Sequence, residues 1–145
     1  MLVSVWSDLT GPAAIDPSRS AIARTAWIAA AAWYAAMALR WRGSRQLFRG
    51  VYIWGCAAYL LHVAVAFHLA HGWSHREAFL HVQRSSGFGA GIFVSYAFTL
   101  LWVFDAGWCL VNREGYFDRL PKWNLGVYSF MAFVVFNATV VFVLI

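Results

Sequence analysis

Four long apolar segments separated by short charged stretches are the feature that most constrains this chain. The apolar segments cover residues 21–39, 51–71, 87–111 and 125–145. Each approaches or exceeds the roughly 20 residues that a helix needs to cross the hydrocarbon core of a bilayer. Because lipid offers the backbone no hydrogen bonds, helices are favoured over open strands. The sequence therefore predicts an all-α integral membrane protein, a single domain built as a bundle of four transmembrane helices.

The charged residues support a membrane protein and argue against a nucleic-acid-binding one. Only 12% of the residues are charged and 62% are hydrophobic, whereas soluble domains carry about a quarter charged residues. The charges also collect at the ends of the apolar segments, so the net charge of +5 indicates membrane topology rather than a basic face for nucleic acid. The expected partners are the lipid bilayer and either further copies of the chain, as a homo-oligomer, or a partner membrane subunit. Both cysteines fall inside apolar segments, where cysteine usually acts as a small apolar side chain.

The basic residues are divided unevenly between the two ends of the predicted bundle. Residues 40–50 and 112–124 lie on one side and hold seven Lys and Arg residues, whereas the other side holds four: Arg19, Arg24, Arg76 and Arg84. Positive residues accumulate on the cytoplasmic side. We therefore expect a protein of the bacterial inner membrane, with both termini and the link between the second and third spans on the periplasmic side.

The segments between the spans are predicted to be short and polar. Residues 1–20 read as a surface tail without a signal-peptide core, and Asp16 and Pro17 have the residue types that begin a helix. Residues 72–86 are polar and predict a short amphipathic helix between the second and third spans. Residues 112–124 predict a polar loop in which Trp123 anchors the membrane interface.

Histidine is concentrated in one stretch. All five histidines lie within residues 51–82, and three of them form an H-x2-H-x3-H pattern: His68, His71 and His75. If the helix continues through Gly72, a step of about 100° per residue places the three imidazoles in one patch at the outer membrane edge. His81 joins these three if residues 74–77 turn the chain into a second short helix.

This pattern predicts a transition-metal site formed by His68, His71, His75 and His81. Neutral imidazoles suit copper, zinc and iron, and three of them leave one coordination position open. Glu77 is a candidate ligand for that position, or a hydrogen-bond acceptor for one of the ligands. The alternative is that these histidines are ordinary residues of the membrane interface, where amphipathic rings lie at headgroup level.

His62 lies near the middle of the second span, at a depth similar to that of Asn137 and Thr99. One interpretation is a neutral histidine that hydrogen-bonds Asn137 or Thr99 and holds helices together. The other is a haem or metal ligand, or a proton-relay group. The other spans contain no histidine, so bis-histidine ligation of haem b would require a homo-oligomer, a partner membrane subunit, or His81 folding back.

Asp105 lies inside the third span, where a carboxyl group is costly unless it is protonated, hydrogen-bonded or open to water. By depth, its expected neighbours are Tyr34, Cys56 and Ser129, with Tyr128 and Tyr59 within a turn. Asp105 is therefore either a functional group or a structural one that accepts tyrosine and serine hydroxyls and locks three helices together.

Two families resemble parts of this pattern. The spacings within His68–His75 resemble the histidine boxes of integral-membrane desaturases and hydroxylases, which implies a di-iron site made from several boxes, whereas this chain has one cluster. Four spans with a lone midplane histidine resemble the membrane anchors of respiratory complexes. Neither resemblance extends further, so the sequence assigns no family.

The leading hypothesis is a small histidine-rich, metal- or haem-binding, redox-associated membrane subunit. One alternative is a non-catalytic accessory subunit of a larger membrane complex. The other is a proton or small-solute pathway through Asp105, His62 and Asn137, which would need oligomerisation because four helices enclose only a narrow conduit. The sequence indicates no substrate and no reaction.

Overall fold

The structure is a computed structural model that describes residues 17–141, apart from the side chains of Ser85, Ser86 and Val141. Every regular element in this part of the chain is helical, so the predicted all-α class is confirmed. The elements are α2 (Pro17–Trp41), α3 (Arg45–Ala70), α4 (His75–Ser86), α5 (Gly91–Val111), α6 (Arg113–Phe117), α7 (Pro121–Phe136) and the π-helical η1 (Asn137–Val141). The predicted tail up to Asp16 and positions 142–145 of the predicted fourth span lie outside the described residues.

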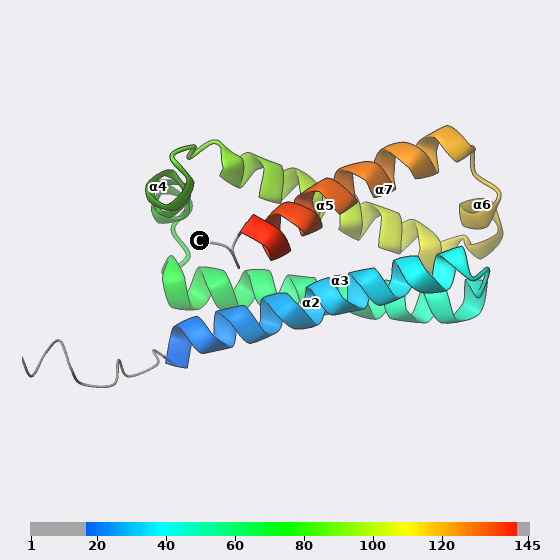
Figure 1. Ribbon diagram of the computed structural model, residues 1–145, viewed down its shortest axis with the longest axis horizontal. Coiled ribbons are helices and arrows are strands. Elements are labelled where there is room, and N and C mark those ends of the chain that lie inside the picture. Colours follow the sequence, from blue (N-terminus) through cyan, green and yellow to red (C-terminus); the bar gives the residue numbers. More distant parts are fainter. Residues whose placement is uncertain (1–16, 142–145) are drawn as a thin grey trace, which may run out of the picture.

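Four of these helical segments are long and apolar enough to cross a membrane: α2, α3, α5, and α7 with its continuation to Val140. They run along the long axis of the molecule, with short helices at its two ends (Figure 1). We name the end that carries α4, residues 68–91, the histidine end. The opposite end carries the α2–α3 turn and α6, residues 40–49 and 112–124, and we name it the basic end.

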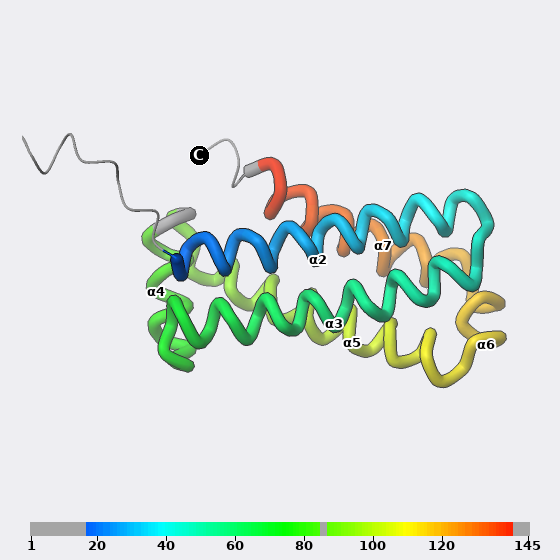
Figure 2. Tube along the Cα trace, turned by 90° about the horizontal axis from the view of Figure 1, so that it is seen from below, coloured from blue at the N-terminus to red at the C-terminus, as the bar shows by residue number. Residues whose placement is uncertain are grey.

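Helices α2 and α3 form a hairpin and pack against each other along most of their length (Figure 2). The turn between them needs Gly43, whose φ of +73° is a backbone conformation that side-chain-bearing residues rarely adopt. Further along, Gly55 allows close approach, because a Cβ at this position would lie 3.1 Å from the Cβ of Ala32. Small residues at a helix contact are the usual way in which membrane helices approach closely.

The core lies between α2, α3, α5, α6 and α7 and is rich in aromatic rings. Its largest fully buried side chains include Phe48, Tyr52, Trp102, Tyr116 and Met131. Phe48 and Tyr52 stack with ring centroids 5.1 Å apart. The core is therefore concentrated towards the basic end.

The long helices begin at other residues than the predicted spans do. Helix α3 already begins at Arg45 instead of Val51, since long basic side chains can extend from a helix end towards water. Helix α5 begins at Gly91 instead of Gly87, and α7 begins at Pro121, a residue suited to the first helical position. The predicted loop 112–124 contains α6, whose start is capped by the Asn112 side chain.

Candidate functional site

The second span ends before its histidine pattern is complete. Helix α3 stops at Ala70, and both Gly72 (φ +51°) and Trp73 (φ +62°) adopt left-handed backbone conformations. The N–H of Trp73 donates to the carbonyl of Phe67 at 3.0 Å and closes the helix end. The helix therefore does not continue through Gly72, and the single helical patch of His68, His71 and His75 does not form. A positive φ at a bulky residue such as Trp73 is uncommon and is a strained conformation.

The predicted short helix is present and folds back across the end of the bundle (Figure 1). Ser74 caps α4, because its hydroxyl accepts a hydrogen bond from the Glu77 N–H at 3.3 Å. His81 lies in the second turn of α4, and its ring contacts the His71 ring, with ring centroids 5.2 Å apart and ring planes at 70°. Nδ1 of His71 is buried and has no hydrogen-bond partner among the described residues. The tertiary structure thus joins His71 and His81.

The other two predicted ligands point elsewhere. Nδ1 of His75 lies 2.8 Å from the hydroxyl of Tyr96 on α5. His68 is exposed, and its ring centroid lies 6.5 Å from that of Trp73. Within residues 17–141, no group of three His, Cys, Asp or Glu side chains gathers closely enough to hold a metal ion. The four predicted ligands are therefore divided into one close pair and two separate residues.

The surroundings of His71 favour its neutral, ligand-competent form. Burial lowers the pKa of His71 below its ordinary value, and the neighbouring His81 lowers it further. The carboxylate of Glu77 acts in the opposite direction and offsets part of this shift. Glu77 itself lies 3.8 Å from both Arg76 and Arg84 in exposed ion pairs, which hold it only weakly.

The predicted midplane hub of His62, Asn137, Thr99 and Asp105 does not form. Nδ1 of His62 lies 3.1 Å from the Thr25 hydroxyl on α2, so neither Asn137 nor Thr99 is its partner. The Thr99 hydroxyl lies 3.0 Å from that of Tyr59, and the Asn137 amide donates to the carbonyl of Phe133 on its own helix. Depth along the spans had suggested the hub, but depth does not fix the direction in which each side chain points. Thr25, a hydroxyl residue in an alanine-rich span, was the missed partner.

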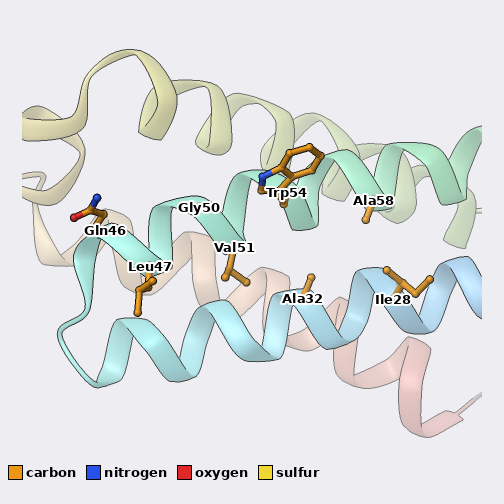
Figure 3. A pocket seen from close by; sticks show the side chains of 8 residues that line it. All are labelled: Ile28, Ala32, Gln46, Leu47, Gly50, Val51, Trp54 and Ala58. Atoms are coloured by element: carbon orange, nitrogen blue, oxygen red, sulfur yellow. The ribbon is translucent and has the colours of Figure 1, made fainter.

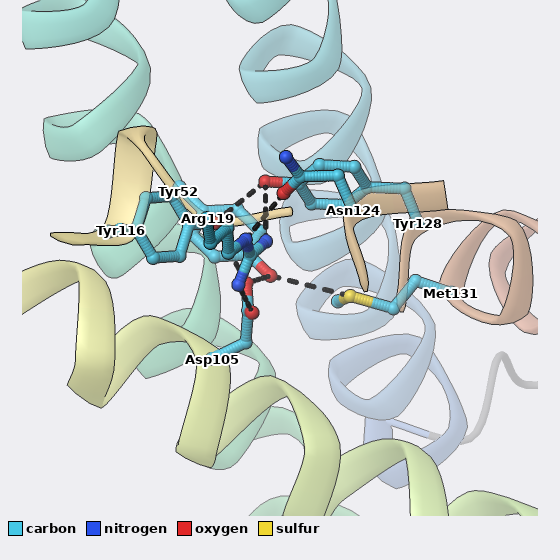
Figure 4. A network of polar contacts seen from close by, with 7 residues as sticks. All are labelled: Tyr52, Asp105, Tyr116, Arg119, Asn124, Tyr128 and Met131. Carbon is cyan, nitrogen blue, oxygen red and sulfur yellow. Dashed lines mark hydrogen bonds and ion pairs between the residues drawn. The ribbon is translucent and has the colours of Figure 1, made fainter. Parts of the chain in front are cut away.

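Asp105 is fully buried at the basic end, and both of its carboxylate oxygens are used (Figure 4). Oδ2 accepts hydrogen bonds from the hydroxyls of Tyr52 at 2.9 Å and Tyr116 at 2.8 Å. Oδ1 accepts a hydrogen bond from the guanidinium of Arg119, which also forms an ion pair with it. Tyrosine hydroxyls thus bind Asp105, as the structural interpretation expects, but they come from Tyr52 and Tyr116. Of the expected neighbours, Tyr34 instead contacts Thr139.

The network continues from Arg119 into α7. Its guanidinium donates to the Asn124 side chain and, at 3.2 Å, to the Tyr128 hydroxyl, which lies 2.7 Å from that of Tyr116. Burial raises the pKa of Tyr116, so its hydroxyl stays protonated. These bonds connect α3, α5, α6 and α7. Sequence reasoning missed Arg119 because it placed this residue in the polar loop 112–124, whereas α6 turns that segment back over the bundle.

An apolar hollow of about 490 Å³ lies along the α2–α3 hairpin. It is lined by Ile28, Ala32, Gln46, Leu47, Gly50, Val51, Trp54 and Ala58 (Figure 3). None of these side chains is titratable or nucleophilic. The hollow therefore offers no groups for catalysis or for metal binding.

Comparisons of the chain with known protein families, with curated proteins and with solved structures found no match. The functional argument therefore rests on the geometry of the two ends of the bundle.

Proposed function

We propose that this protein is a membrane subunit that binds a transition-metal ion, copper, zinc or iron, at its histidine end. His71 and His81 are the proposed ligands. The observation that carries the proposal is the close approach of these two rings, 5.2 Å between centroids, across the junction of α3 and α4. Zn–N bonds are about 2.0–2.1 Å long, and rings at this separation can each direct one nitrogen at a common ion.

Three further observations support the pair as a ligand set. A ring nitrogen of His71 is buried without a hydrogen-bond partner among the described residues, which is costly unless something binds it. The pKa of His71 is lowered by burial, so the residue remains neutral and does not need to release a proton. The strained Trp73 lies in the turn that brings α4 back over His71, and such strain is typical of functional sites.

The proposed site has two protein ligands, and water or the nearby Glu77 would supply further ones. His68 and His75 are not part of it, because their rings have other neighbours. Haem is the less favoured cofactor because His62, the midplane candidate ligand, is engaged by Thr25. We propose that the histidine end faces the periplasm, since the opposite end carries the greater number of basic residues.

The test is a metal titration of the full-length protein purified in detergent. Zn²⁺ and Cu²⁺ affinities are measured by competition with a chelator, and bound metal is counted by elemental analysis. We expect one ion per chain in the wild-type protein and a loss of binding in His71→Ala and in His81→Ala. His68→Ala is the matched control and should bind like the wild type. Equal losses in all three variants, or no saturable binding, would refute the assignment.

A second candidate is a non-catalytic accessory subunit of a larger membrane complex, whose polar residues specify helix packing. The observation in its favour is the saturation of Asp105, whose two oxygens are occupied by Tyr52, Tyr116 and Arg119. A carboxylate held in this way is a poor proton carrier. This candidate predicts that liposomes containing the wild type and liposomes containing Asp105→Asn have the same proton flux. It also predicts that the purified protein binds neither Zn²⁺ nor Cu²⁺ stoichiometrically.

A further inference from the structure

We propose that the basic end holds a binding site for the phosphate group of an anionic phospholipid. This site is independent of the metal proposal and lies at the other end of the molecule. A hollow of about 320 Å³ opens beside the α2–α3 turn. Its lining consists of two arginines, two aromatic rings and the turn glycine: Arg40, Arg45, Phe48, Phe117 and Gly43.

The arginines of the basic end differ in their partners, and both of those that line the hollow are without an ion pair in the described residues. Arg49 donates to the carbonyls of Cys109 and Leu110 at the end of α5, at 3.1 and 3.0 Å. Arg119 is paired with Asp105. Arg40 and Arg45, in contrast, form no ion pair with any carboxylate in residues 17–141. Two uncompensated guanidinium groups therefore border the same hollow.

Aromatic rings hold these guanidinium groups in place without neutralising them. The Arg40 guanidinium carbon lies 5.2 Å from the ring centre of Phe48 and 5.6 Å from that of Phe117. The Arg45 guanidinium lies 5.3 Å from the same Phe117 ring. Cation–π contacts fix position at these distances, while the N–H donors in the guanidinium plane remain available for an anion. Planar guanidinium forks match the oxygens of a phosphate group.

The position of the hollow points to a lipid as the source of that phosphate. Trp41, at the end of the membrane-spanning α2, is 96% exposed, and Leu47 on the other side of the turn is 61% exposed. Tryptophan residues at the ends of membrane helices lie at headgroup level. The hollow is therefore at the depth of lipid phosphates, and basic sites beside membrane helices attract anionic headgroups. Free phosphate also carries negatively charged oxygens, but only a lipid phosphate is held by the bilayer at the depth of the hollow.

The experiment measures lipid binding to the full-length protein in detergent by native mass spectrometry. Phosphatidylglycerol is the anionic probe and phosphatidylcholine the zwitterionic one. We expect phosphatidylglycerol to bind preferentially, and its affinity to fall about tenfold or more in the double variant Arg40→Gln/Arg45→Gln, since this variant loses two charge-assisted donors to the phosphate. The matched control, Arg42→Gln/Arg113→Gln, removes the same charge from exposed positions of the same end and should bind like the wild type.

Two further measurements keep the proposal open to refutation. Arg40 contacts rings of the core, so Arg45→Gln alone, at an exposed residue, is tested as a variant that preserves the fold and should still weaken binding. Equal losses in the control variant would show a diffuse charge effect and overturn the site, as would equal affinity for the two lipids. Displacement of phosphatidylglycerol by millimolar inorganic phosphate would overturn the lipid assignment in favour of free phosphate.

Discussion

The two ends of this bundle both gather polar side chains at the edge of a membrane-spanning core, but they differ in how completely those side chains are satisfied. At the basic end, Asp105 is fully buried and has partners on both oxygens. At the histidine end, His71 keeps a ring nitrogen without a hydrogen-bond partner among the described residues. The closed network suits a structural role, and the incomplete one suits ligand binding.

The difference has a physical origin in the helices that supply each end. The basic end draws its network from α3, α5, α6 and α7, so the two buried charges, Asp105 and Arg119, meet complementary groups inside the core. The histidine end consists of one helix terminus and the short α4, which folds back through the left-handed residues Gly72 and Trp73. A fully satisfied buried network rigidifies a structure, whereas an incomplete one leaves a donor or acceptor for another partner.

The largest expected effect comes from breaking the closed network. Asp105→Ala leaves the buried Arg119 guanidinium without its carboxylate, so we expect the free energy of unfolding to fall by about 3–5 kcal/mol. Denaturant unfolding in detergent, followed by circular dichroism, measures this. Asp118→Ala, an exposed acid of the same segment, is the control. The double variant Asp105→Leu/Arg119→Leu should lose less than the sum of the losses in Asp105→Leu and Arg119→Leu; simple additivity would show that the pair is not coupled.

A smaller loss is expected when one hydroxyl of the same network is removed. Tyr52→Phe keeps the ring but deletes a hydrogen bond to the Asp105 carboxylate, and it should lower the free energy of unfolding by about 1.5–3 kcal/mol. The same unfolding assay measures it. Tyr34→Phe removes a more exposed hydroxyl, which contacts Thr139, and should cost less. If the two variants were equally stable, the network would not be the distinguishing feature of the basic end.

A substitution at the histidine end should change the affinity for Zn²⁺ rather than the free energy of unfolding. His71→Ala is expected to reduce Zn²⁺ affinity by at least about tenfold, because even outer-shell changes at metal sites typically cost 10–100-fold. Its unfolding free energy without metal should stay close to that of the wild type, since the ring has few partners to lose. A chelator competition assay and an unfolding curve on the same preparation separate the two quantities. A large loss of stability with unchanged affinity would reverse the roles assigned to the two ends.

The smallest expected effect concerns His62, which lies between the two ends. Thr25→Val removes the hydroxyl 3.1 Å from Nδ1 of His62 while keeping the side-chain shape. Hydrogen bonds between membrane helices average about 0.6 kcal/mol, so the loss should be of that size. Unfolding measurements on Thr25→Val, His62→Ala and the double variant test the pair. A loss several times larger would indicate a second role for His62 beyond this contact.

Much of the fold followed from local sequence. The four apolar segments and the polar residues 72–86 were enough to predict a helical bundle with a short helix between the second and third spans. Side-chain partners were harder to predict. His62 was paired with the wrong helix, and Arg119 was not recognised, because equal depth in a bilayer leaves the facing direction of a side chain undetermined.

The sequence by itself determined that this chain forms membrane-length helices, because apolar composition and segment length act through local rules of backbone satisfaction in lipid. It also identified Asp105 and the histidine stretch as the places where polar side chains within or beside apolar spans need partners or a function. Only the tertiary structure decided which of those groups meet: a left-handed turn at Gly72 and Trp73 brings His81 to His71, and α6 returns Arg119 to Asp105. Such contacts depend on the direction in which short connecting segments fold back, which is set by packing rather than by local composition.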